Sequence, residues 1–232
     1  MMNLLEQSLG QLACDLPGAT RIFHRYKLDF CCGGQQSLRE AMEAGDVEPA
    51  DLLADLAEIR HDEVQEQDWR HAPMSELIEH ILLRFHEVHR EQLPELIRLA
   101  RQVEETHGQR ADHPTGLVKH LVGMYQDLLS HLQKEEQVLF PLLRHDESRK
   151  AQLPMLVMRH EHDAHGQGLQ KLAQLTADFS VPEDACNTWR ALYAGLVRLK
   201  EDLMQHIHLE NNVLFPQAEQ AGGCPAWSPC QV

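Results

Sequence analysis

The stretch that decides the fold is residues 131–141, HLQKEEQVLFP, because the chain contains it twice. It returns at residues 206–216 as HIHLENNVLFP, and both copies follow the pattern His-x-x-x-Glu-x-x-Val-Leu-Phe-Pro. Residues four positions apart lie on one face of an α-helix, about 6 Å from each other along its axis. Each copy therefore predicts a helix with an imidazole and a carboxylate on the same side.

A second repeated segment lies upstream of each copy. HEVHREQL at residues 86–93 returns 76 positions later as HDAHGQGL at residues 162–169. The chain therefore contains two copies of a helical hairpin, and each hairpin offers histidine on its first helix and His-x-x-x-Glu on its second. Spacing alone does not choose between His86 and His89, or between His162 and His165, because both members of each pair lie on nearby helix faces.

Four imidazoles and two carboxylates suit a two-iron centre inside a helix bundle. Each non-heme iron would take two histidines, and both glutamates would bridge the two ions. The remaining positions would accept an oxo or hydroxo bridge and a small ligand such as dioxygen or nitric oxide. Exposed ion pairs are the competing explanation for His-x-x-x-Glu, but they require no partner histidine at a fixed offset. The two copies are the only matches to this motif in the chain.

From about residue 74 onward, apolar residues recur every three or four positions, which is typical of amphipathic helices. We expect helices over residues 73–107, 115–143, 154–177 and 182–217, with Pro94 bending or breaking the first and Pro154 opening the third. The short connections favour an all-α, up-and-down antiparallel four-helix bundle. The expected organisation is a small helical module (1–60) in which Pro17 opens a second piece, a linker (61–73), the bundle (74–218) and a flexible tail (219–232).

The composition excludes several classes of partner. A formal net charge of −15 repels nucleic acid and anionic membrane surfaces. No long apolar run or secretory signal is seen, so a cytoplasmic location is expected. The six cysteines are irregularly spaced, which favours reduced thiols. Sixteen histidines are many for this length and suggest a metal site or a pH-sensitive surface, since their scatter excludes a purification tag.

Cys31 and Cys32, followed by two glycines, form the other unusual motif. Adjacent cysteines close only a strained disulfide ring, so we interpret them as two thiols held at a turn for metal handling or redox work. The alternative is two small residues at a structural turn. Cys14 and Cys186 are expected in the core on helical apolar faces, and no role is assigned to Cys224 and Cys230.

Other polar residues lie near the expected ligands. Glu161 and Asp127 are candidates for tuning the site or relaying protons, with a plain solvated carboxylate as the alternative. The remaining histidines considered are expected near the ligands or on the surface: His107, His160 and His208.

These motifs together carry a resemblance to a known family. The bundle resembles the hemerythrin-like domain, and residues 5–218 look like the di-iron proteins of iron-sulfur cluster repair, the Repair of Iron Centres family. The stretch LDFCCGG at residues 28–34 matches that family's N-terminal signature. The resemblance implies the ligand set His86, His131, Glu135, His162, His206 and Glu210. It also implies repair of clusters damaged by nitric oxide or peroxide, with damaged iron-sulfur proteins as partners.

Three hypotheses follow for the function. The first is a stress-response repair protein that donates iron, which the cysteine pair favours. The second is a binder or sensor of dioxygen or nitric oxide, for which the bundle alone would suffice. The third is a redox enzyme that reduces nitric oxide at the di-iron site. A homodimer is one of the oligomeric states considered, and the sequence does not decide the repair targets, the bridging ligand or whether turnover is catalytic.

Overall fold

The chain is all-α, as the sequence predicts. The computed structural model describes residues 4–16, 18–45, 47–59, 68–145 and 147–222, which hold helices, turns and one isolated bridge between Ser8 and Ser37. None of the described helices is both long enough and apolar enough to cross a membrane. Pro17, most of the expected linker and the tail cysteines Cys224 and Cys230 lie outside the described residues.

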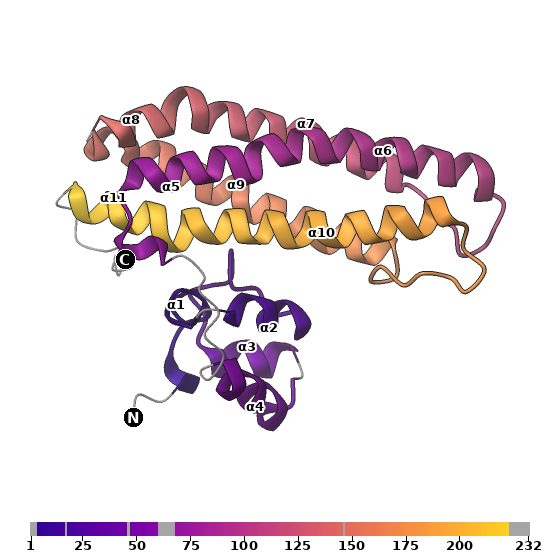
Figure 1. Cartoon of the computed structure of the whole chain (residues 1–232), viewed down its shortest axis with the longest axis horizontal. Coiled ribbons are helices and arrows are strands. Elements are labelled where there is room, and N and C mark those ends of the chain that lie inside the picture. Colours follow the sequence, from indigo (N-terminus) through magenta and orange to yellow (C-terminus); the bar gives the residue numbers. More distant parts are fainter. Residues whose placement is uncertain (1–3, 17, 46, 60–67, 146, 223–232) are drawn as a thin grey trace, which may run out of the picture. The chain divides into compact units, whose positions relative to one another are not determined.

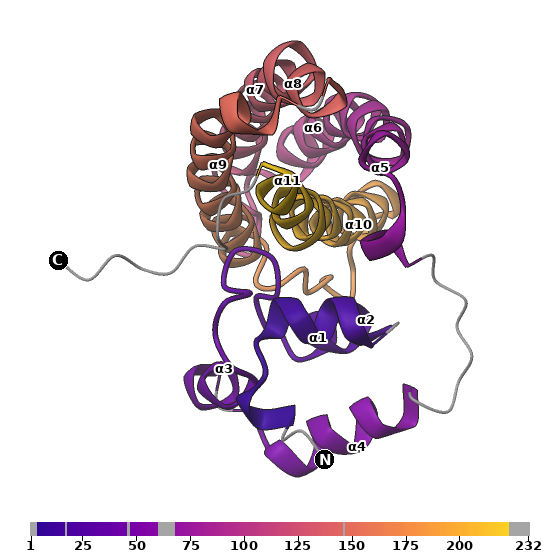
Figure 2. The same cartoon turned by 90° about the vertical axis from the view of Figure 1, so that its left-hand side faces the viewer.

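Four long helical stretches build the antiparallel bundle, and they run side by side in Figures 1 and 2. Their main parts form one compact unit, residues 79–142 and 153–203. The last stretch shows why the sequence folds this way, because Leu192, Leu196, Leu199 and Leu203 recur on one face and are all at most 1% exposed. Each such leucine contributes roughly 1.5–3 kcal/mol through burial. The helices of the four stretches are, in order, α5 (Met74–Ile81) with α6 (Glu87–His107), α7 (Leu117–Lys134) with α8 (Phe140–Arg144), α9 (Ser148–Leu175), and α10 (Asn187–Leu209) with α11 (Phe215–Ala221).

A second compact unit holds the N-terminal helices together with the described residues 143–145, 147–152 and 204–222. Its N-terminal part has a small core of its own around Phe23 and Phe30, both 0% exposed. The side-chain oxygen of Ser8 accepts from the backbone of Gln11 and caps the start of α1. The helices of this part are η1 (Leu4–Glu6), α1 (Leu9–Asp15), α2 (Ala19–Arg25), α3 (Leu38–Gly45) and α4 (Pro49–Ile59), and a short helix η2 (Trp69–His71) precedes α5.

Two prolines lie inside helices where the sequence predicted a helix start, at Pro154, and a bend or break, at Pro94. Pro154 does not open the third helix but lies inside α9, which begins six residues earlier at Ser148. α6 runs unbroken through Pro94, so the expected break is absent there. A proline removes one backbone hydrogen bond, and these two helices continue past that loss because packing along their buried faces stabilises them.

The fourth helix starts later than predicted, at Asn187 instead of Pro182. Backbone turns occupy the intervening residues, and the Arg190 guanidinium donates to the carbonyls of Glu183 and Ala185 at 2.6 and 3.1 Å. Cys186 therefore lies in a loop, half-buried, instead of on a helical apolar face as expected. Cys14 does lie on a helix, and it is also half-buried instead of in the core.

Three of the helical stretches contain a wider, π-helical turn: η3 (Leu82–His86), η4 (Glu135–Leu139) and η5 (Glu210–Leu214). In η4 the Phe140 backbone N–H donates to the Glu135 carbonyl, five residues back, and Phe215 does the same to Glu210 in η5. A proline follows each of these phenylalanines, and its ring would clash with the carbonyl four residues earlier in a regular helix. The repeated Phe-Pro therefore explains why both copies widen here.

Candidate metal centre

The six residues that the sequence singles out are all buried, at 1% exposure or less. Each of the four helical stretches supplies at least one of them. The π-helical turns position three, because η3 ends at His86, η4 begins at Glu135 and η5 begins at Glu210. The other three lie on regular helices: His131 on α7, His162 on α9 and His206 on α10.

Within the bundle unit, Glu135 is surrounded by three imidazoles. Its carboxylate oxygens lie 3.4 Å from His86 Nε2, 3.2 Å from His131 Nε2 and 4.0 Å from His162 Nε2. The Nε2 atoms of His131 and His162 are themselves 3.2 Å apart. In the second repeat, His206 Nε2 lies 3.4 Å from Glu210 Oε1.

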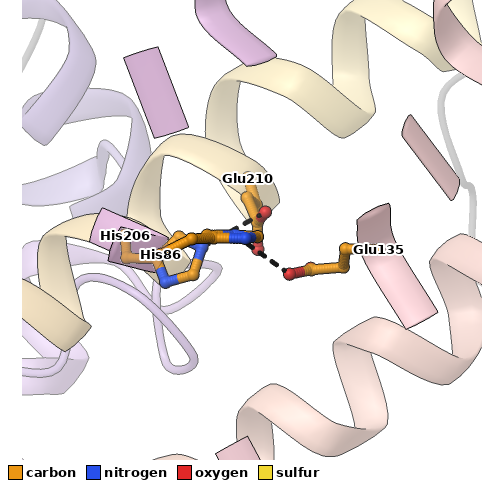
Figure 3. A group of neighbouring side chains, drawn as sticks. All are labelled: His86, Glu135, His206 and Glu210. Carbon is orange, nitrogen blue, oxygen red and sulfur yellow. Dashed lines mark ion pairs between the residues drawn. The ribbon is translucent and has the colours of Figure 1, made fainter. Parts of the chain in front are cut away.

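The six residues fall into two groups that could each hold a metal ion. One group is His86, Glu135, His206 and Glu210, shown in Figure 3, and the other is His131, Glu135, His162 and Glu210. Within each group the ligand atoms lie within 4.8 Å of one another. Each group thus has two imidazoles of its own, and the two groups share both carboxylates.

The donor set fits a transition-metal centre. Ligand atoms about 3–4 Å apart are the separation expected when each lies about 2.0–2.2 Å from one ion. His131 donates its Nδ1 proton to a carboxylate, so its neutral ring directs the lone pair of Nε2 toward His162 Nε2. A fully buried carboxylate surrounded by imidazole nitrogens is an arrangement that a cation between them stabilises. Imidazole and carboxylate ligands of this kind suit iron.

Two outer carboxylates orient the ligand histidines. His86 Nδ1 donates to Glu136 at 2.8 Å, and His131 Nδ1 donates to Glu161 at 3.0 Å. Each carboxylate also accepts a hydrogen bond from one basic side chain. Arg90 donates to Glu136 at 2.6 Å, and Lys134 donates to Glu161. Such partners fix the tautomer and raise the basicity of the ligand nitrogen.

The pKa values of both carboxylates reflect these bonds. The hydrogen bond from His131 lowers the pKa of Glu161 to about 2, with help from Lys134 and against some desolvation. Burial raises the pKa of Glu136, but its bonds to His86 and Arg90 outweigh that effect and lower it overall. Both groups are therefore ionised at neutral pH. The sequence singled out Glu161 but missed Glu136, although its place directly after Glu135 on a polar face was a usable signal.

The structure separates the histidines that spacing left open. His86 and His162 belong to the metal-holding groups, whereas His89 and His165 do not, although both are buried. The His165 ring lies edge-on to His131, with ring centroids 4.8 Å apart, and burial lowers its pKa to about 3. Asp127 is exposed and belongs to neither group.

The three remaining histidines take different positions. His160 is exposed, and His107 is half-buried beside Cys186, with 3.1 Å between its Nε2 and the sulfur. His208 is 3% exposed and contacts Phe30, which lies between α2 and α3, so it is a core residue of that unit.

The Cys31–Cys32 turn is built around Asp29. One Asp29 oxygen accepts from the backbone N–H groups of Cys31 and Cys32 at 3.1 and 2.9 Å, and from the Cys31 thiol at 3.2 Å. The two sulfurs are 3.7 Å apart, and these three residues form a third group that could hold a metal ion. The hydrogen bond with Cys32, burial and the nearby Asp29 carboxylate all raise the pKa of Cys31 well above its ordinary value.

The second repeat holds this turn in place. Asn211 and Asn212, directly after Glu210, donate to the carbonyls of Cys31 and Phe30, each at 3.2 Å. The first repeat has Glu136 and Gln137 at the equivalent positions. Asn212 also packs closely against a glycine of α1, where an added Cβ would lie 2.5 Å from its side-chain oxygen. Sequence analysis missed this contact, and the change from Glu-Gln to Asn-Asn between the copies was its only signal.

Comparisons with known proteins agree with this geometry. The hemerythrin HHE cation binding domain matches residues 77–218, and a domain of unknown function, DUF542, matches residues 5–60. The fold and site thus define a hemerythrin-type cation-binding bundle with an added N-terminal domain.

Curated relatives identify a narrower family within the hemerythrin-type proteins. The iron-sulfur cluster repair protein YtfE of Musicola paradisiaca is 48% identical over 217 residues, covering 94% of this chain and 98% of the relative. The proteins of the same name from Pectobacterium atrosepticum and Yersinia pseudotuberculosis are 46% and 45% identical over the same shares. The chain belongs to the family of iron-sulfur cluster repair proteins.

Proposed function

We propose that this protein repairs iron-sulfur clusters damaged by nitrosative or oxidative stress and that it does so by donating iron from a two-iron centre. The observation that carries the proposal is the pair of metal-holding groups that share Glu135 and Glu210. The names of its relatives, which cover nearly the whole chain, support the repair role.

In this proposal His86 and His206 hold one iron, and His131 and His162 hold the other. Glu135 and Glu210 bridge the two, and an oxo or hydroxo group completes the bridge. When bound, the iron pair would supply redox chemistry and open positions for a small ligand such as nitric oxide or dioxygen. The helices contribute burial, which excludes water, and the outer carboxylates keep the Nε2 lone pairs directed inward.

The Cys31–Cys32 turn gives the N-terminal domain a role in iron transfer. Without a cation, Cys31 remains a protonated thiol beside Asp29. A metal ion reverses that preference, because a coordinating thiol loses its proton. Two sulfurs and one carboxylate within 4.8 Å of each other then form a small, soft ligand set for an iron ion in transit.

The test combines iron content with a repair assay. Purified protein should hold about two irons per chain and should restore the activity of an iron-sulfur enzyme damaged with nitric oxide. Cys31→Ser with Cys32→Ser should keep the iron content of the bundle and lower repair, because the bundle ligands and the cysteines belong to separate parts of the sequence. Equal repair at equal iron loading would reduce the cysteine pair to a structural turn.

A gas-binding or nitric-oxide-reducing protein predicts a different outcome. Such a protein would bind or consume nitric oxide while its iron content stayed constant, and damaged clusters would not recover. Measuring iron per chain before and after repair separates donation from both alternatives, since only donation depletes the protein.

A further inference from the structure

A groove of about 750 Å³ lies in the bundle unit between α7 and α9. Gly116 and one face of the following α7, as far as Lys134, form one wall, and one face of α9, from His160 to Leu175, forms the other. Where a bundle interface ordinarily carries leucines, these faces carry one leucine and one methionine among small, polar and charged residues. The two helices therefore leave space between them that their side chains do not fill.

The packing of the bundle does not require a glycine at position 123, which lines this groove. Gly123 lies inside α7, where glycine costs roughly 0.5–1 kcal/mol relative to alanine. A Cβ added there would meet no atom within 4 Å, and at Gly168 across the groove it would make ordinary contact with Met124. Gly195 on α10 is different, because a Cβ there would lie 2.6 Å from Leu96. The groove glycines thus keep space open at a cost to stability, which points to an occupant.

Three lysines against two acidic residues, Asp127 and Glu161, give this groove a small excess of positive charge in a strongly acidic protein. The chain has only six lysines, and three of them line this groove: Lys119, Lys134 and Lys171. Lys134 pairs with Glu161, whereas Lys119 and Lys171 form no ion pair among the residues that the structure describes. Two unpaired ammonium groups on facing helices suit a ligand with at least two anionic groups.

His165 extends the groove to the neighbourhood of the metal centre. It is 8% exposed, it lines the groove, and its Nε2 has no hydrogen-bond partner among the described residues. Its ring lies against His131, one of the proposed iron ligands. A ligand in the groove would therefore meet a free imidazole nitrogen at the buried end and ammonium groups at the rim.

We infer that this groove binds a small polycarboxylate of the class that chelates iron in solution, with carboxylates at Lys119 and Lys171 and a further donor at His165. The volume is in the range of sites for small organic ligands and is far larger than a diatomic gas requires. A chelator bound in this groove would exchange iron with the two-iron centre. This last role rests on the proposed function, whereas the binding site does not.

Citrate serves as the probe, measured by equilibrium dialysis against the iron-loaded protein, with iron per chain determined afterwards. Lys119→Gln with Lys171→Gln should weaken citrate binding roughly tenfold or more, because two charged contacts are lost. Lys150→Gln is the matched control, since Lys150 is an exposed lysine paired with Glu147 outside the groove. Gly123→Leu should abolish binding by filling the groove, with an unchanged or higher melting temperature.

Three results would overturn the inference: equal citrate binding by the double lysine variant and the Lys150 control, unchanged binding by a folded Gly123→Leu protein, or competition by inorganic phosphate at the same concentration as citrate. The last would indicate a general anion site. Loss of repair in a protein that still binds citrate in the predicted way would count against the proposed function and leave the groove assignment standing.

Discussion

The outer carboxylate Glu161 offers the sharpest test of the metal centre. Glu161→Gln keeps the size of the side chain and an oxygen that can accept the His131 Nδ1 proton, but it removes the negative charge. A hydrogen bond to a charged group contributes about 1.5–3 kcal/mol and a neutral one about 1 kcal/mol, so the change should cost about 1–1.5 kcal/mol of metal binding. That corresponds to roughly a tenfold loss of affinity, at the lower end of the effects expected for such outer partners.

The assay is the loss of iron to a ferrous chelator, followed over time at neutral pH. Glu161→Gln should release the iron held by His131 and His162 first, whereas Glu136→Gln should preferentially loosen the iron held by His86 and His206. Mössbauer spectra of partly depleted samples would report which iron remains. Glu105→Gln, at an exposed position on α6, is the control. Iron retention by Glu161→Gln equal to that of this control would refute the role assigned to the outer carboxylates.

Further predictions concern the bridging residues and the contact with the N-terminal helices. Glu135→Ala or Glu210→Ala should each lower the occupancy of both irons together in metal analysis, and clean loss of a single iron would argue against bridging. Asn212→Ala should destabilise the N-terminal helices by about 1–3 kcal/mol in denaturant unfolding, because the Phe30 carbonyl and a ring nitrogen of His208 lose their partner. Burial lowers the pKa of His208 to about 4, so its stabilising neutral form is complete above about pH 6.5 and is lost as the pH falls to 4. Unfolding free energy should therefore drop by about 3 kcal/mol over that window beyond the drop seen in His208→Gln, and equal slopes for the two proteins would contradict the assignment.

The repeat in the sequence predicted the fold and four of the six residues that the structure brings together, and the family resemblance chose His86 and His162 for the other two. Periodicity works well there because a buried helix face and an i,i+4 pair are local features that need no knowledge of neighbouring helices. Spacing alone could not separate His86 from His89, since the choice depends on the rotation of the helix about its axis. The π-helical turn that ends at His86 affects that rotation, and no proline follows it closely to mark it.

Features that depend on packing between distant segments could not be predicted from the sequence. Pro154 looked like a helix start, although α9 begins earlier. The bond from Glu136 to His86 joins residues 50 positions apart, and the bonds from Asn211 and Asn212 to the cysteine turn span more than 180 positions. The groove between α7 and α9 was hidden for another reason, because small and polar residues on a helix ordinarily indicate a solvent-exposed face.

The two hairpins differ in their outer residues, yet the two metal positions are matched. The first copy carries Glu136 where the second has Asn211, and the second copy carries Glu161 where the first has Phe85. As a result, each position has one histidine whose Nδ1 donates to an outer carboxylate, His86 in one position and His131 in the other. Each of these carboxylates also has one basic neighbour. The protein therefore gives neither position a clear electrostatic advantage, so if both positions held iron, a single added electron would have no preferred site.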